Sequence, residues 1–267
     1  NTMAGLASLG SLGVYVGKVH DDRLGDVFTR SMKGLGVTFT TRPGVMGAPT
    51  ASSMIAVTPD GQRSMNTHLG ACRELVPDDV DEEQIAAAKV IYVEGYLWDE
   101  ENAKQASRKA MRAAKKAGGQ VALTLSDPFC VGRFREEFLD LMHNQLDIVF
   151  ANEEEAKALF EEQDFSKVVD HVRRWGGICA LTRSAKGCVI VKGDEIHEIP
   201  AAPVAEVVDT TGAGDQFAAG FLYGLTREMP LGVCGRLGVM AAAEVISHYG
   251  ARPEVSLEKL AQKNGLL

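Results

Sequence analysis

Residues 209–222 read DTTGAGDQFAAGFL, and this stretch is the most informative about the fold. An acidic residue comes first, a Gly-Ala-Gly turn follows, and Asp215 begins a run of small and apolar residues that predicts a buried helix. Glycines allow a close approach of the backbone to a ligand, and the free N–H groups of a helix start attract anions. The pattern therefore indicates an anion site where Asp215 takes a proton from a hydroxyl group. A glycine-rich helix start capped by Asp215 is the simpler alternative.

The same stretch resembles the C-terminal signature of the ribokinase (PfkB) family of carbohydrate and nucleoside kinases. The signature residues are Asp209, Thr210, Gly212, Ala213, Gly214, Asp215, Ala219 and Gly220. The resemblance implies ATP-dependent phosphorylation of a hydroxyl group, with Asp215 as the catalytic base. It also implies an anion hole formed by Gly212, Ala213 and Gly214, and a nucleotide site to which Asp209, Thr211, Gly212 and Gly214 contribute.

The composition is that of an ordinary globular protein, with 267 residues of which 45% are hydrophobic and 24% are charged. A net charge of −8 without a run of Lys or Arg argues against a nucleic-acid surface. No apolar run approaches the ~20 residues of a membrane span. Five scattered cysteines without a zinc-binding spacing favour reduced thiols and a cytoplasmic location. We expect a small-molecule substrate, no nucleic-acid or membrane partner, and a monomer or a homodimer.

Strands and helices are predicted to alternate from residue 89 onward, at 89–93, 99–117, 121–125, 133–143, 146–151, 153–161, 165–175 and 178–182. This alternation indicates parallel βαβ units with right-handed crossovers. Further strands are predicted at 188–192 and 195–199, and further helices at 214–227, 231–248 and 257–263. The predicted fold class is α/β: a ribokinase-like, doubly wound, mainly parallel sheet with helices on both faces and a small β lid.

The N-terminal part favours helices at 1–13 and 22–35 and a strand at 14–19. Residues 53–57 and 64–69 flank the turn signal Pro59-Asp60-Gly61, which predicts a β-hairpin. We expect a single kinase domain over 1–267, in which parts of 14–70 form the lid. A lid of this kind excludes water from phosphoryl transfer.

The chain begins inside NTMAGLASLG, which resembles the middle of the family's first signature. The resemblance implies that Asn1 binds a substrate hydroxyl, and that an N-terminal strand region with an acidic substrate residue is missing from this sequence. The glycine-rich spacing that follows in the family is matched by Gly10, Gly13, Gly17, Asp22 and Gly25. Met3 and His20 depart from the pattern, which puts the lid hinge in doubt rather than the chemistry.

Two further motifs follow predicted strands, at the edge where parallel sheets bind ligands. ANEEE at 151–155 resembles the N-x-x-E motif, which implies that Asn152 and Glu155 act near Mg²⁺, Glu155 partly through water. The residues alone equally fit an Asn cap on an acidic first turn. TRSAKG at 182–187 resembles a T-x-x-x-x-G nucleotide loop, with Thr182, Ser184 and Gly187 lining the ATP site, although a plain turn is the alternative. The family also suggests a K⁺ site at Asp209.

The acceptor is suggested by longer segments, VTPDGQRSMNTHLGA, VEGYLWD, LTLSDPFC and CGRLGVMAAAEVISHYGARP, which resemble the bacterial adenosine-kinase-like branch of the family. That resemblance implies phosphorylation of the adenosine 5′-hydroxyl to AMP. The residues expected to line the acceptor pocket are Asn1, Met65, Asn66 and Glu94, with Met54, Met65, Tyr96 and Phe129 available for a base or for the core. The alternatives are a sugar kinase for ribose, fructose or another sugar, and a non-catalytic nucleotide- or sugar-binding protein. P-loop and protein-kinase motifs are absent from the sequence.

Overall fold

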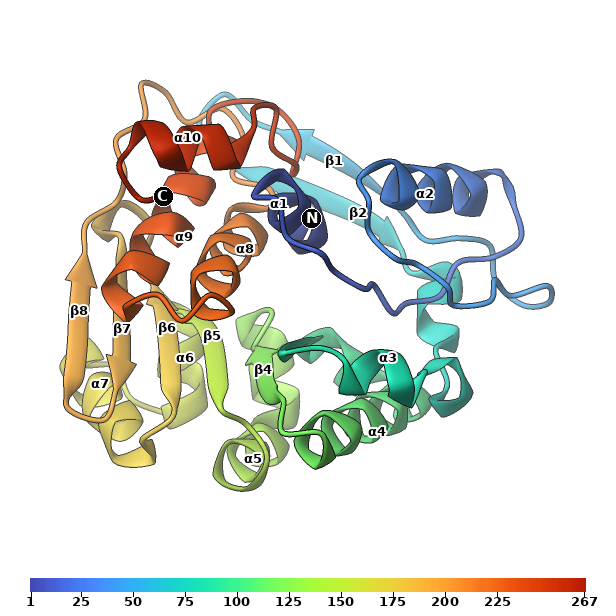
Figure 1. Ribbon diagram of the computed structural model, residues 1–267, viewed down its shortest axis with the longest axis horizontal. Coiled ribbons are helices and arrows are strands. Elements are labelled where there is room, and N and C mark those ends of the chain that lie inside the picture. Colours follow the sequence, from blue (N-terminus) through green and yellow to red (C-terminus); the bar gives the residue numbers. More distant parts are fainter. The chain divides into compact units, whose positions relative to one another are not determined.

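The computed structural model describes residues 1–267 and divides the chain into two compact units (Figure 1). The first unit comprises residues 1–80 and 202–267, and the second comprises residues 81–201. None of the helices combines the length and the apolar character that crossing a bilayer requires. The single kinase domain expected over 1–267 stays a prediction.

The second unit is built on a six-stranded sheet whose strand order follows the sequence. The strands are β3 (Val90–Glu94), β4 (Gln120–Thr124), β5 (Ile148–Asn152), β6 (Ile178–Thr182), β7 (Cys188–Lys192) and β8 (Glu195–Ile199). Pairing is parallel from β3 to β6 and antiparallel from β6 to β8. The predicted α/β class with a mainly parallel sheet is confirmed.

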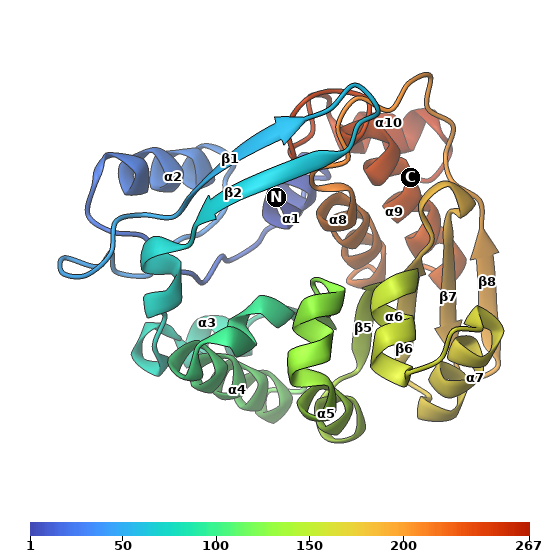
Figure 2. The same cartoon turned by 180° about the vertical axis from the view of Figure 1, so that it is seen from behind.

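The first helix of this unit precedes β3, and the other four connect successive parallel strands. In chain order, the helices are α3 (Glu82–Ala86), α4 (Glu101–Lys116), α5 (Pro128–Asn144), α6 (Glu153–Phe160) and α7 (Phe165–Trp175). Because the strands follow one another in space, right-handed crossovers place the connecting helices on one face of the sheet. Helices α6 and α7 accordingly lie behind β6 and β7 in Figure 1 and in front of them in Figure 2. The core between these layers contains the fully buried Leu123, Ile148 and Leu159.

Helix α5 begins five residues before the predicted start at Arg133. Asp127 caps it by accepting a hydrogen bond from the Cys130 N–H at 2.7 Å, and Pro128 occupies the first helical position. Phe134 has non-helical angles of φ −122° and ψ 18°, which kink the helix there. The predicted helix at 133–143 corresponds to the segment after this kink.

The first unit combines helices with a two-stranded ribbon. Its elements are α1 (Thr2–Ser8), α2 (Arg23–Gly34), β1 (Ser52–Val57), β2 (Arg63–His68), α8 (Ala213–Leu225), α9 (Leu231–Val245) and α10 (Leu257–Lys263). Helices α1, α8, α9 and α10 share a core that includes Leu9, Tyr223, Leu237 and Leu257. Figure 1 shows these four helices gathered together, with the ribbon beside α1 and α2.

The N-terminal predictions are confirmed in part. Helix α2 is capped by Asp22 as expected, and β1 and β2 form the predicted antiparallel hairpin. Helix α1 ends sooner than predicted, and Gly10 just beyond it adopts φ +79°. The strand predicted at 14–19 is wrong, because the segment meets neighbouring backbone only in isolated bridges at Val14 and His20.

Candidate active site

The DTTGAGD stretch forms a turn that leads into α8. Gly212 is the N-cap residue, with φ 81°, a left-handed conformation that glycine adopts without strain. A Cβ atom on Gly212 would lie 2.7 Å from the Ala251 Cβ and 2.8 Å from the Ala251 carbonyl oxygen, so space also requires glycine. Above Gly214, by contrast, no atom lies within 4 Å of the Cβ position. Because no side chain caps this helix start, its first N–H groups can bind an anion.

Asp215 does not cap α8, so the capping role that the simpler interpretation gave it is wrong. Its Oδ2 accepts a hydrogen bond of 2.7 Å from Asn1 Nδ2, which joins two residues 214 positions apart in the sequence. Sequence analysis assigned Asn1 to the acceptor hydroxyl and Asp215 to its proton. The structure therefore brings these two predicted residues together within the first unit.

The turn at residues 209–214, called the anion turn after the ligand that the sequence predicts, is hydrogen-bonded to two other segments of the first unit. Asp209 is 3% exposed, and its carboxylate oxygens accept hydrogen bonds from the N–H groups of Thr211 at 2.9 Å and Gly250 at 3.0 Å. Thr210 binds the hairpin turn through its N–H and hydroxyl, both of which donate to the Gly61 carbonyl. Arg63 of β2 also donates to the Thr210 hydroxyl at 2.9 Å. The hairpin and the anion turn are thus one connected structure.

Sequence analysis missed the buried Gln216, which directly follows Asp215. It is 0% exposed, and its side-chain amide donates to the carbonyl oxygens of Asn1 at 3.1 Å and Ala251 at 3.0 Å. The signal was a single long polar residue within a run that predicts a buried helix, since a buried amide must find hydrogen-bond partners.

In the second unit, the predicted residues meet at the carboxyl-terminal edge of the parallel strands. Glu94 at the end of β3 pairs with Thr124 at the end of β4. Asn152 at the end of β5 pairs with Thr182 at the end of β6. The N-x-x-E motif and the TRSAKG loop are therefore neighbours, as expected for ligand-binding residues of a parallel sheet.

Asn152 and Glu155 form a capping box at the start of α6. Asn152 Oδ1 accepts from the Glu155 N–H at 2.8 Å, and Glu155 Oε2 accepts from the Asn152 N–H at 2.9 Å. Glu155 is 5% exposed, and burial, with the charge of Asp127 acting in the same direction, raises the pKa of its carboxyl to about 7. The capping interpretation is thus confirmed, and it is compatible with the predicted role of Glu155 near Mg²⁺.

This donor set fits Mg²⁺ held through water. The Glu155 oxygens are both engaged by Asn152, whose side-chain amide donates to Oε1 at 2.6 Å. No group of three or more His, Cys, Asp or Glu residues could enclose a metal ion. Mg²⁺ commonly keeps several waters and uses one or two carboxylates together with substrate phosphates, which agrees with an arrangement of this kind.

The TRSAKG loop joins the antiparallel strands β6 and β7, and its side chains anchor it to neighbouring elements. Arg183 Nε donates to Glu153 Oε2 at 2.7 Å, and its guanidinium lies 3.9 Å from the centre of the Phe165 ring. Hydrogen bonding from Arg183 holds the pKa of Glu153 down to about 2. Gly187 has φ 83°, and a Cβ there would collide with the Ile199 carbonyl, so this position requires glycine. Sequence analysis missed Arg183 and Glu153 as the link between the two motifs.

The residues expected to contact a base are exposed rather than part of the core. Met54 is 75% exposed, Met65 53%, Tyr96 50% and Phe129 81%. In the hairpin, Met54 pairs with Asn66, and Ile55 pairs with Met65. Paired residues share a face and adjacent residues point to opposite faces, so Met65 and Asn66 lie on opposite faces of the ribbon. One face of the hairpin cannot present both predicted residues to a ligand.

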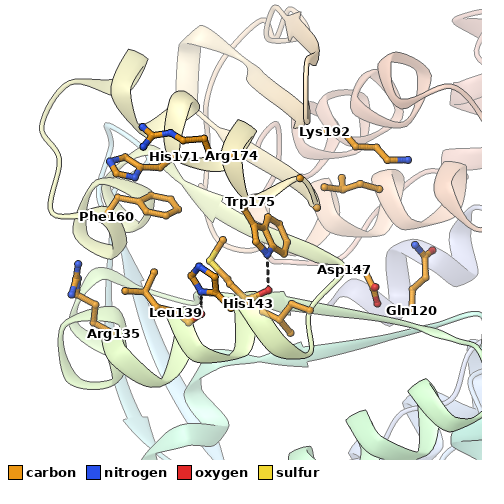
Figure 3. Close-up of a pocket in the computed structure, with 15 residues that line it drawn as sticks. Gln120, Arg135, Leu139, His143, Asp147, Phe160, His171, Arg174, Trp175 and Lys192 are labelled. Carbon is orange, nitrogen blue, oxygen red and sulfur yellow. Dashed lines mark hydrogen bonds between the residues drawn. The ribbon is translucent and has the colours of Figure 1, made fainter.

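A cavity of about 780 Å³ in the second unit lies at the opposite edge of the sheet (Figure 3). Its lining includes Gln120 and Ile178, which begin β4 and β6. Figure 3 shows His171 and Arg174 toward one end and Lys192 toward the other, with Trp175 between them. The charged groups do not converge, and the cavity contains none of the residues predicted to act in catalysis.

Comparison with known proteins agrees with these motifs. The sequence matches the pfkB family carbohydrate kinases over residues 1–258. An uncharacterized sugar kinase of Archaeoglobus fulgidus is 30% identical over 255 residues, which cover 93% of this chain and 96% of that protein. A probable sugar kinase from Rhizobium etli is 50% identical, with a TM-score of 0.98 over 100% of this chain and 81% of the other. Adenosine kinase from Sinorhizobium meliloti is 50% identical, with a TM-score of 0.96 over 99% of this chain and 81% of the other. The chain belongs to the pfkB family of carbohydrate kinases, ATP-dependent enzymes that phosphorylate hydroxyl groups.

Proposed function

We propose that this kinase phosphorylates a hydroxymethyl group of a nucleoside, specifically the 5′-hydroxyl of adenosine, to form AMP. The observation that carries the proposal is the 2.7 Å hydrogen bond between Asn1 and Asp215 at a helix start without a side-chain cap. A hydroxyl bound by Asn1 lies within reach of the Asp215 carboxylate, and the adjacent helix start favours a phosphate. The residues proposed to bind the acceptor, to act as the base and to form the anion hole are thus connected within the first unit.

In the proposed reaction, Asp215 accepts the proton of the acceptor hydroxyl while the hydroxyl oxygen forms a bond to the γ-phosphorus of ATP. The bond from that phosphorus to the bridging oxygen breaks, and ADP leaves with the electron pair. The backbone N–H groups of Gly212, Ala213 and Gly214 stabilise the charge on the group in transit. Phosphoryl transfer depends mainly on positioning and electrostatic stabilisation, which this turn supplies.

The nucleotide-binding residues proposed in the second unit are Thr182, Ser184 and Gly187 of the TRSAKG loop. Those proposed in the first unit are Asp209, Thr211, Gly212 and Gly214. Asn152 and Glu155 would hold Mg²⁺, Glu155 through water. When bound, Mg²⁺ neutralises charge on the phosphates.

A K⁺ ion at Asp209 is a further part of the proposal. Asp209 is buried and accepts hydrogen bonds from backbone N–H groups, and the buried hydroxyl of the neighbouring Thr211 interacts with its carboxylate. This hydroxyl provides an oxygen ligand beside a negative charge. We expect higher activity in K⁺ than in Na⁺ at equal ionic strength, measured as initial rates. Equal rates in both salts would contradict the site.

Adenosine is favoured over a free sugar by one similarity and one structural observation. The Sinorhizobium meliloti protein is an adenosine kinase, and the exposed Met65 of the first unit offers apolar surface to a base. A sugar kinase acting on ribose, fructose or another sugar is the second candidate, because two of the similar proteins are described as sugar kinases. A non-catalytic binding protein has less support, because the proposed base Asp215 is present and lies in hydrogen-bond contact with Asn1.

The hairpin of β1 and β2 is proposed to act as the lid, since its side chains are largely exposed and its turn contacts the anion turn. A cytoplasmic location and a monomer or homodimer complete the proposal.

The decisive experiment measures ADP release by the full-length protein with adenosine, other nucleosides, ribose and fructose as acceptors. Adenosine is expected to give the highest kcat/KM. Asp215→Asn is expected to retain ATP binding and lose about 10² to 10⁴ of the rate. A better rate with a sugar would support the second candidate, and ATP binding without turnover for any acceptor would support the non-catalytic protein. An Asp215→Asn rate within a few-fold of wild type would overturn the mechanism.

A further inference from the structure

Gln216 connects three segments of the first unit through one side chain. It lies in the first turn of α8, directly after Asp215, and is completely buried. Its Nε2 donates to the Asn1 carbonyl at 3.1 Å and to the Ala251 carbonyl at 3.0 Å. An amide nitrogen carries two hydrogens, so both are used to hold these carbonyls.

The orientation of this amide follows from its surroundings. A flipped amide would turn its oxygen toward two carbonyl oxygens, which cannot donate a hydrogen bond. In the observed orientation, Oε1 is buried without a partner and faces Gly5, where an added Cβ would collide with it. A buried oxygen without a partner lowers stability, and an apolar side chain of similar size avoids this cost. Stability alone therefore does not explain a glutamine here.

The Asn1 and Ala251 carbonyls belong to two segments of the predicted site, one that binds the acceptor and one that lies against the anion turn. Asn1 is held twice by consecutive residues of α8, through its side chain by Asp215 and through its carbonyl by Gln216. Ala251 lies against Gly212 of the anion turn, and the adjacent Gly250 N–H binds Asp209. Gln216 thus ties the acceptor side of the site to the phosphate side.

We propose that Gln216 is a positioning residue that keeps Asn1 at its distance from Asp215 and keeps the loop at Ala251 against the anion turn. This inference rests on the proposed function, in which Asn1 binds the acceptor hydroxyl and Asp215 takes its proton. Gln216 itself touches no substrate and acts through the two carbonyls. Small displacements of a reacting group reduce rates steeply, so loss of these hydrogen bonds affects acceptor turnover more than ATP binding.

The test compares two substitutions that differ in polarity. Both remove the two N–H groups of the Gln216 amide. Gln216→Met preserves length and removes the polar group, whereas Gln216→Glu preserves shape and is acidic. Both are expected to lower the acceptor kcat/KM by about tenfold or more while the KM for ATP changes little. Leu222→Met serves as the control, because Leu222 is a buried residue of the same helix whose exchange for methionine alters packing alone.

Each outcome separates the positioning role from the proposed function. Wild-type kinetics in a folded Gln216→Met enzyme would overturn the positioning role, as would a defect confined to one of the two variants or a defect that Leu222→Met shares. Failure of both variants to fold would assign Gln216 to folding instead and would also overturn it. Asp215→Asn is measured alongside: if it stays active, the proposed function fails; if it is inactive while Gln216→Met is normal, only the positioning role fails.

Discussion

At the scale of single residues, the presence of glycine at the two positions of the anion turn has two different physical explanations. Gly212 is required by its backbone, because it adopts φ +81° and lies against Ala251. Gly214 adopts an ordinary conformation with open space above it, so the protein fold does not require glycine there. The open space at Gly214 is where the proposed mechanism places the phosphate. We therefore propose that a ligand, rather than the fold, explains this second glycine.

Gly214→Val tests this distinction. Valine is a better helix residue than glycine and its Cβ atom enters open space, so stability is expected to stay within about 1 kcal/mol of wild type. Its side chain occupies the proposed phosphate position, and we expect kcat to fall by about 10². The matched variant Gly212→Ala is expected to lose about 1–3 kcal/mol of stability, because alanine is strained at positive φ. Thermal unfolding and initial rates check both. Unchanged turnover in Gly214→Val would mean that the loop is only a helix start.

At the scale of elements, the start of α6 combines a helix cap with the proposed contact to Mg²⁺. The capping box orders the helix, and its Glu155 is buried with a pKa raised to about 7. Arg183 connects this turn to the TRSAKG loop through Glu153. The element therefore combines a firmly held backbone with a carboxyl group that titrates near neutral pH. A cation near Glu155 would favour the ionised form, which links Mg²⁺ binding to proton release.

Glu155→Gln separates the two roles, because glutamine also completes a capping box but has no carboxyl group to titrate or to attract a cation. The folded-state pKa of Glu155 lies above its ordinary value of 4.5. Its contribution to stability is therefore fully present below pH 4.5 and is lost as the pH rises through 7. We expect wild type to lose on the order of 1–3 kcal/mol relative to Glu155→Gln across this range without Mg²⁺, measured by denaturant unfolding. Parallel stability curves would contradict the raised pKa.

The same variant reports on the metal. Wild type is expected to need more Mg²⁺ for half-maximal rate as the pH falls below 7, because the protonated carboxyl no longer attracts the cation. Glu155→Gln is expected to need more Mg²⁺ than wild type above pH 7 and to show no such trend. Identical Mg²⁺ titrations for the two proteins would leave Glu155 with the capping role alone.

At the scale of the whole molecule, local signals predicted most elements, and tertiary contacts account for the rest. The strands β6, β7 and β8 and the helices α7 and α10 cover their predicted residues, because continuous apolar runs and periodic faces identify such elements directly. The start of α5 was missed although Asp127 and Pro128 are a readable cap signal. Residues 14–19 have strand-like composition, but a strand also needs a partner, and none extends along this segment.

The candidate site was likewise predicted from local motifs but not in its tertiary contacts. The motifs placed Asn1 and Asp215 in one reaction, and the structure joins them across 214 positions. The supporting contacts, such as Gln216 with Ala251 and Arg63 with Thr210, were not predicted. They depend on side chains that meet only after folding, and no local pattern identifies their partners.

The two faces of the hairpin allow the adenosine assignment to be tested. Arg63 and Met65 are two residues apart on β2 and therefore share a face, and Arg63 binds Thr210 of the anion turn. Met65 thus lies on the face that turns toward the proposed site, while Asn66 and its partner Met54 lie on the other. Met65→Ala is expected to lower kcat/KM for adenosine by about tenfold, because a buried Met contributes about 1.5–3 kcal/mol. It should leave turnover of free ribose unchanged, since a sugar has no base to bury. The matched variants Met54→Ala and Asn66→Ala are expected to change neither rate. Steady-state kinetics with both acceptors decide the matter: an equal loss for both in Met65→Ala, or a larger loss for adenosine in Met54→Ala, would contradict a base bound against this face.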